Sequence, residues 1–128
     1  MPKWSEYLAH AKERGSLAFE VYRVVSTPNG DMDLLQRTLP DHLRYIGERE
    51  ADGAIMLAGP LSDETGEEMQ GVGMLILRAE SLEAAKALAD GDPMHSSGAR
   101  SYTIRKWMIN EGAINIQVRL GGQKAAFG

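Results

Sequence analysis

Residues 72–77, Val-Gly-Met-Leu-Ile-Leu, form a short apolar run without a charged side chain. A strand that is apolar on both faces is typical of the interior of a sheet, so the run predicts a central strand from Val72 to Leu77. Upstream, Ala54 to Ala58 indicates a second short strand, which Gly59-Pro60 should end. The polar stretch from Ser62 to Gln70 predicts an exposed loop between the two strands.

A helix is predicted upstream of this strand pair. Thr38 and Asp41 have the spacing of a capping box, and Pro40 would lie in the first turn, where its missing N–H costs little. The helix is therefore predicted to begin at Thr38 and to end near Asp52. Its buried stripe is predicted at apolar positions that recur every three or four residues: Leu39, Leu43 and Ile46.

A second helix and two further strands complete the core of the chain. Ser81 can cap the second helix and Gly91 can stop it. The buried face of that helix is predicted to consist of small and apolar residues: Leu82, Ala85, Leu88 and Ala89. The two strands are predicted from Leu17 to Val25, which is rich in Phe, Tyr and Val, and from Ser101 to Trp107, which can alternate between two faces.

The order of the predicted elements within residues 17–108 is strand, helix, strand, strand, helix, strand. This order predicts an α+β, ferredoxin-like βαββαβ domain, with an antiparallel sheet and both helices on one face. The other face of the sheet would then have no cover within the subunit. Two such sheets packed face to face would bury it, so we expect a homodimer.

Both ends of the chain extend beyond this pattern. Residues 1–16 predict an amphipathic helical extension, and residues 109–128 predict a C-terminal strand and tail. The strand is expected to be half-buried at an edge or against a partner, because apolar residues alternate strictly with polar ones: Ile114, Ile116, Val118 and Leu120. The small and polar residues from Gly121 to Gly128 are expected to fray.

Composition excludes several classes of function. The chain has 14 Lys and Arg against 18 Asp and Glu, a net charge of -4, and no basic cluster, so nucleic acid is not an expected partner. Without cysteine, a disulfide framework or a thiolate metal site is impossible. No stretch approaches the roughly 20 apolar residues that span a bilayer, and charges interrupt Met1 to Arg14, so neither a membrane span nor a signal peptide is expected. We expect a cytoplasmic protein.

His42 and Asp92 are the residues that point most directly to chemistry. His42 would lie in the first turn of its predicted helix, where unpaired amides favour the neutral, proton-accepting ring. Asp92 follows Gly91 and precedes Pro93. If its carboxylate reaches His42, it can fix the ring tautomer and stabilise the protonated form. The alternatives are a His that only packs or caps and an Asp that only forms a turn.

Three further residues are candidates for substrate binding. Tyr45 can donate a hydrogen bond in the same pocket, Arg100 can attract an anion, and Met94 can line the cavity. Packing for Tyr45 and a salt bridge for Arg100 are the alternative interpretations. His95 follows Asp92 by three positions, but one carboxylate and two His are too few for a convincing metal site, so we expect no metal or cofactor and an exposed His95.

Several short motifs together resemble a known family. They are Pro40-Asp41-His42-Leu43, Leu57-Ala58-Gly59-Pro60-Leu61, Ser81-Leu82-Glu83-Ala84-Ala85, Asp92-Pro93 and Arg100-Ser101-Tyr102-Thr103-Ile104-Arg105. In these motifs the chain is similar to the YciI-related proteins of the dimeric α+β barrel superfamily, from about Ala18 to Trp107. The resemblance implies a ferredoxin-like dimer in which a His and an Asp, here His42 and Asp92, form a catalytic pair. One branch of the family looks like a dehydrochlorinase of a hydroxylated chloroaromatic.

Two functions follow as hypotheses. The first is a small-molecule lyase or isomerase in which His42 moves a proton and Asp92 orients it, acting on a hydroxylated aromatic or lactone without a redox cofactor. The second is a non-catalytic dimeric module that binds a metabolite in the same cleft. Loss of turnover on changing either residue would distinguish the enzyme from the module.

Overall fold

The computed structural model describes residues 1–128, which divide into two compact units. One unit consists of residues 20–107, and the other combines Met1–Phe19 with Met108–Gly128. No helix in either unit has both the length and the apolar composition that a membrane crossing requires. The larger unit holds the residues with candidate chemistry.

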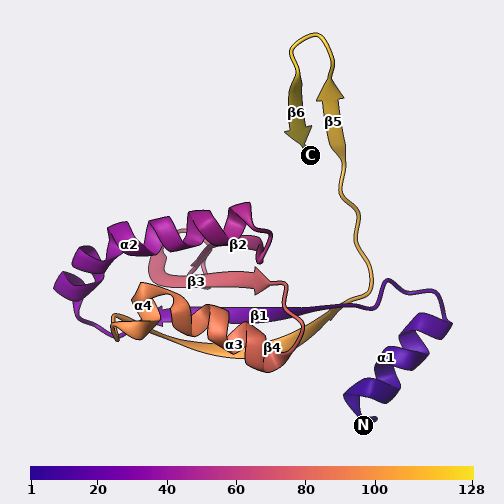
Figure 1. The fold of residues 1–128 in the computed structure, drawn as a ribbon, viewed down its shortest axis with the longest axis horizontal. Coiled ribbons are helices and arrows are strands. Elements are labelled where there is room, and N and C mark those ends of the chain that lie inside the picture. Colours follow the sequence, from indigo (N-terminus) through magenta and orange to yellow (C-terminus); the bar gives the residue numbers. More distant parts are fainter. The chain divides into compact units, whose positions relative to one another are not determined.

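A four-stranded sheet forms the larger unit together with helices α2 (Met32–Ala51) and α3 (Leu82–Gly91) (Figure 1). The strands are β1 (Phe19–Pro28), β2 (Ile55–Ser62), β3 (Met69–Leu77) and β4 (Arg100–Ile109), in the spatial order β2-β3-β1-β4. β3 is antiparallel to both of its neighbours. The predicted βαββαβ order and the central position of the apolar strand are therefore confirmed.

The core lies between one face of this sheet and the two helices. Tyr22 and Val24 of β1 project from the same face, because strand residues two apart share a side. They pack in one cluster with Ala85 and Ala89 of α3, and Ile46 of α2 lies against it. Both helices thus cover the face that bears Tyr22 and Val24.

The predicted start of α2 at Thr38 is wrong, because the helix begins earlier. Asp31 is the N-cap, and its side chain accepts a hydrogen bond from the backbone N–H of Leu34 at 3.0 Å. Thr38 is buried inside the helix and donates to the carbonyl of Leu34 at 2.7 Å. Pro40 is an interior residue of the helix with its ring exposed, so it removes one backbone hydrogen bond without ending the helix.

The predicted buried stripe of α2 is correct for Ile46, which packs on the core, but wrong for the two leucines. Leu39 and Leu43 are 40% and 58% exposed. The inward side instead carries residues spaced by three or four positions: Thr38, His42, Tyr45, Ile46 and Arg49. His42 lies about three turns from the first residue of α2, so the unpaired amides of the helix N-terminus do not act on it.

Strand β2 extends past the residues that were predicted to end it. Gly59-Pro60 lies within the strand, and Pro60 pairs with Gly73 of β3. The prediction failed because β2 is an edge strand of the sheet. Proline is tolerated there because a missing N–H on the open side leaves no ladder bond unmade.

The smaller unit contains helix α1 (Trp4–Glu13) and a hairpin of β5 (Ile116–Arg119) with β6 (Lys124–Phe127). Ala11 of α1 is buried in a small cluster with Ala18 and Met108. The expectation of a frayed tail is wrong, since β6 pairs antiparallel with β5. The expected half-burial of the C-terminal strand is not found within the chain, where Ile116 and Val118 are each 62% exposed.

Candidate functional site

Asp92 sits at the junction of two helices. It is the C-cap of α3 and the N-cap of the one-turn helix α4 (Pro93–Ser96). The backbone N–H of Met94 donates to Oδ1 of Asp92 at 2.9 Å. Asp92 is only 3% exposed, so its carboxylate is buried. The hydrogen bond from the Met94 amide helps to hold this carboxylate in one orientation.

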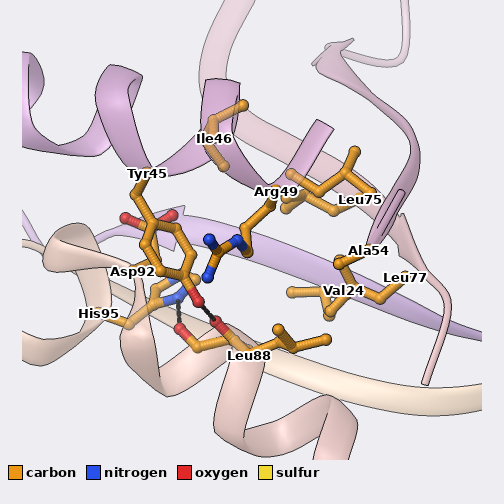
Figure 2. Close-up of a pocket in the computed structure, with 12 residues that line it drawn as sticks. Val24, Tyr45, Ile46, Arg49, Ala54, Leu75, Leu77, Leu88, Asp92 and His95 are labelled. Atoms are coloured by element: carbon orange, nitrogen blue, oxygen red, sulfur yellow. Dashed lines mark hydrogen bonds between the residues drawn. The ribbon is translucent and has the colours of Figure 1, made fainter. Parts of the chain in front are cut away.

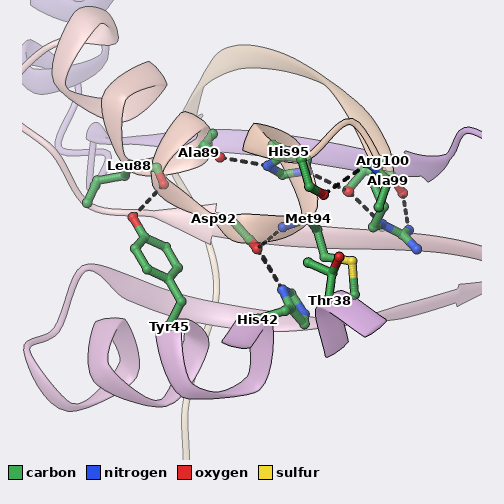
Figure 3. Close-up of polar contacts among 12 residues, drawn as sticks. Thr38, His42, Tyr45, Leu88, Ala89, Asp92, Met94, His95, Ala99 and Arg100 are labelled. Atoms are coloured by element: carbon green, nitrogen blue, oxygen red, sulfur yellow. Dashed lines mark hydrogen bonds and ion pairs between the residues drawn. The ribbon is translucent and has the colours of Figure 1, made fainter. Parts of the chain in front are cut away.

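His42 of α2 reaches that carboxylate (Figure 3). Its Nδ1 lies 2.8 Å from Oδ1 and 2.9 Å from Oδ2 of Asp92. An ionised carboxylate only accepts hydrogen bonds, so Nδ1 carries a hydrogen, and in the neutral ring Nε2 keeps the lone pair. The His42 side chain is 24% exposed. The structure thus brings together the two residues of the predicted pair, which are fifty positions apart.

Tyr45 lies close to this pair, but its hydroxyl is occupied. It donates to the backbone carbonyl of Leu88 in α3 at 2.7 Å. Burial raises the pKa of Tyr45 above its ordinary value, against a smaller lowering effect of Arg49. The hydrogen bond therefore braces α2 against α3, and it uses the donor that was predicted to contact a substrate.

A small cavity lies between the helices and the sheet (Figure 2). Its volume is about 20 Å³, which is close to the space that one water molecule needs. Four side chains form its polar lining: Tyr45, Arg49, Asp92 and His95. His42 does not line the cavity. Aliphatic side chains such as Val24 and Leu77 form most of the remaining wall.

Arg49 is a lining residue that the sequence analysis did not single out. Its guanidinium carbon lies 5.0 Å from the centre of the Tyr45 ring, and its Nε is 2.9 Å from Oδ2 of Asp52. The signal for it was present in the sequence. His42, Tyr45 and Arg49 are spaced by three and four positions, which places them on one side of a helix.

A second polar network surrounds His95, which was wrongly expected to be exposed. Its Nδ1 is 2.6 Å from the carbonyl oxygen of Ala89, so Nδ1 carries the hydrogen. Its Nε2 is 2.8 Å from Oγ of the buried Ser26 and accepts that hydroxyl hydrogen when the ring is neutral. Oγ of Ser26 also accepts from Nε of Arg100 at 2.9 Å. Both nitrogens of the His95 ring are therefore used inside the protein.

The two other predicted binding residues have internal partners as well. Arg100 donates through Nη2 to the backbone oxygens of Ser26, at 2.8 Å, and Gly71. Burial lowers the pKa of Arg100 from its ordinary value, and the charge of Asp92 partly offsets this. Met94 is 2% exposed and is a packing residue within this chain. No group of three or more His, Asp or Glu side chains is arranged to hold a metal ion.

Comparison with known proteins places this chain in a family. Residues 20–108 match the YCII-related domain, and the chain belongs to that family. This confirms the resemblance that its motifs indicate. Among curated proteins, the uncharacterized protein YjpA of Bacillus subtilis (strain 168) is 29% identical over 76 residues, which cover 59% of this chain and 82% of YjpA.

A solved structure supports the fold class. It is the 5-chloro-2-hydroxyhydroquinone dehydrochlorinase TftG of Burkholderia phenoliruptrix AC1100, in complex with 2,5-dihydroxybenzoquinone. It matches with a TM-score of 0.52 and 20% sequence identity, over 67% of this chain and 92% of that chain. At this identity the likeness establishes the shared α+β fold alone.

Proposed function

We propose that the chain is a small-molecule enzyme of the lyase or isomerase type, with His42 as the proton-transferring base. The observation that carries the proposal is the 2.8 Å contact between Nδ1 of His42 and the buried carboxylate of Asp92. This contact leaves Nε2 of a partly exposed imidazole without a hydrogen, which is the form that a general base needs.

Asp92 has two roles in this proposal. Its hydrogen bond keeps the ring in the tautomer that presents a lone pair at Nε2, and its negative charge stabilises the imidazolium that forms when Nε2 takes a proton. Because the Met94 amide also holds Oδ1, the carboxylate keeps its orientation during the transfer. The electron pair left on the substrate then expels a leaving group in a lyase, or takes the proton back at another carbon in an isomerase.

The substrate class that we propose is a hydroxylated aromatic compound or a lactone. Removal of a proton from a phenol, or from a carbon beside a carbonyl, requires a base but no redox group. The name and bound ligand of TftG, which shares the fold, support a hydroxylated ring. The known relative therefore supplies a first compound to test.

The test is chloride release from 5-chloro-2-hydroxyhydroquinone, measured with a chloride electrode. We expect turnover by the parent protein, and losses of about 100-fold or more in His42→Gln and Asp92→Asn, since general acid–base catalysis contributes 10²–10⁴-fold. Asn at position 92 retains an oxygen for the Met94 amide, so this variant removes the charge but not the cap. His10→Gln in α1, an exposed His, is the matched control. Full activity in both site variants would exclude the dyad.

The alternative is a non-catalytic module that binds a metabolite. Tyr45 and Arg100 already have internal partners, so they offer no free polar group to a reaction, which weighs against the enzyme. The cavity beside Asp92, with room for about one water molecule, restricts a bound metabolite as much as a substrate. The alternative predicts no turnover with a broad panel of phenols and lactones. It also predicts equal binding of 2,5-dihydroxybenzoquinone by the parent and both site variants, measured by calorimetry.

We also propose that the chain forms a homodimer through its sheet. The helices cover only the face that bears Tyr22 and Val24, while Leu57 and Trp107 of the sheet are 54% and 45% exposed. A second copy would remove this apolar surface from water. Sedimentation equilibrium should give twice the mass of one chain, and a monomer at micromolar concentration would contradict the proposal.

A further inference from the structure

Gly91, the last residue of α3, is a glycine that its own backbone does not require. Its φ is not positive, whereas the φ of Gly53 after α2 is 84°. In a helix, alanine is more favourable than glycine, because glycine loses more conformational freedom on folding. The reason for a glycine at position 91 must therefore lie in what packs against α3.

Tyr45 of α2 occupies the space that a side chain at position 91 would need. A Cβ atom added to Gly91 would lie 2.7 Å from the hydroxyl oxygen and 3.2 Å from Cζ of Tyr45. Cβ atoms in proteins essentially never come closer than 3.0 Å to another heavy atom. Any side chain at position 91 would thus displace the Tyr45 ring, and its absence lets the ring lie against the backbone of α3.

The Tyr45 hydroxyl also caps the C-terminal end of α3. The last carbonyl groups of a helix have no partner within it, and the backbone N–H of Asp92 bonds to Ala89 rather than to Leu88. Tyr45 donates to the Leu88 carbonyl instead, at 2.7 Å. Figure 3 shows both this contact and that of His42 with Asp92. Two neighbouring side chains of α2 thus contact the end of α3.

We infer that Tyr45 is a positioning residue, which fixes the spacing of α2 and α3 at which His42 reaches Asp92. His42 and Tyr45 are three positions apart and therefore lie side by side on one face of α2. Asp92 directly follows Gly91, the residue against which the Tyr45 ring packs. A displacement of α2 by about 1 Å would break the 2.8 Å hydrogen bond between His42 and Asp92. This role rests on the proposed function of the pair, yet the spacing itself can be measured without a substrate.

The hydrogen on Nδ1 of His42 reports whether the pair is intact. A hydrogen bond to a carboxylate moves the signal of an imidazole N–H downfield in a proton spectrum, and the His42→Gln variant assigns this signal. Gly91→Ala should shift the signal upfield or abolish it, because the added methyl group displaces Tyr45 and α2 with it. Gly47→Ala is the matched control and should leave the signal unchanged, since Gly47 is an exposed residue inside α2 with open space around an added Cβ.

Removal of the Tyr45 hydroxyl should rescue the Gly91→Ala variant. In the Tyr45→Phe background the nearest remaining ring atom is 3.2 Å from the added Cβ, a distance that small shifts can relieve. We expect Gly91→Ala to raise the equilibrium constant of unfolding in urea about five-fold or more in the parent, and at least about two-fold less in the Tyr45→Phe background. The Nδ1 signal of His42 should return toward its parental position in the double variant.

Tyr45→Phe alone keeps the ring and should fold, so it completes the experiment. It lacks the hydrogen bond to Leu88, and the Nδ1 hydrogen of His42 should therefore exchange with water about two- to ten-fold faster than in the parent. An unchanged signal in Gly91→Ala, an equal effect of Gly91→Ala in both backgrounds, or unchanged exchange in Tyr45→Phe would each overturn the inference. Chloride release by the parent is measured separately, and its absence would contradict the proposed enzyme while leaving the spacing assigned to Tyr45 intact.

Discussion

Two histidines near the α3–α4 junction differ in what their rings can still do. His42 donates through Nδ1 to Asp92 and keeps a free Nε2, whereas His95 donates to Ala89 and receives the hydroxyl of Ser26. Only the first ring can take a proton from a substrate without breaking a bond inside the protein. The comparison teaches that the number of internal hydrogen bonds, rather than nearness to a pocket, separates a candidate base from a structural His.

The largest expected effect is on turnover, and it should separate the two rings. In the chloride-release assay, His42→Gln is expected to lose about 100-fold or more, and His95→Gln less than about ten-fold, because only His42 offers a free nitrogen. Circular dichroism should show that both variants are folded. Equal losses of turnover in the two folded variants would show that the free nitrogen of His42 gives it no special role.

The next effect is on stability, where we expect the hydrogen-bond network around His95 to matter although it contributes little to turnover. Ser26→Ala leaves the ring of His95 and Nε of Arg100 without their shared partner in a buried site. We expect it to lower the free energy of unfolding by about 1–3 kcal/mol. The exposed hydroxyl of Ser101 offers a matched control, and Ser101→Ala should change stability by less than about 0.5 kcal/mol. Urea unfolding measures both variants, and similar values for the two would show that the Ser26 network contributes little.

The smallest effect concerns Tyr102, whose ring lies 4.8 Å from the ring of His95. Burial and a 2.6 Å hydrogen bond to Asp90 raise the pKa of Tyr102 to about 12. The unfolded chain therefore loses this proton at lower pH than the folded chain does. The stabilisation is present below about pH 10, the ordinary pKa of tyrosine, and is lost as the pH rises toward 12.

Ultraviolet titration of tyrosinate tests this shift. Tyr102→Phe should remove the most alkaline step, and Asp90→Asn should move that step to lower pH, since a carboxylate no longer opposes the phenolate. An unchanged titration curve in Tyr102→Phe would show that another residue produces the step.

The fold was largely predictable because its signals are local. The central strand at β3, the Ser81 cap of α3 and the order of the elements follow from apolar period and capping residues. The start of α2 was not predictable, because Asp31 and Thr38 are both acceptable N-caps and Pro40 favours a start at Thr38. The choice between them depended on which stripe of the helix could pack on the sheet.

The candidate site was only partly predictable. His42 and Asp92 were singled out from the sequence and lie in contact, although their catalytic role stays a prediction. Tyr45 and Arg100 were predicted for a ligand but bond to the protein itself. Ser26 was missed because a single Ser in a strand carries no signal. It acquires its role only when β1 and the α3–α4 junction meet.

By itself, the sequence determined the element order, the family and the pair of residues worth testing, because periodicity, caps and short motifs depend on near neighbours in the chain. Only the tertiary structure decided which histidine keeps a free nitrogen. The partners that settle this question come from far along the chain: Asp92 is 50 positions from His42, and Ser26 is 69 positions from His95. A hydrogen bond requires contact within about 3 Å, and folding alone brings such distant groups that close.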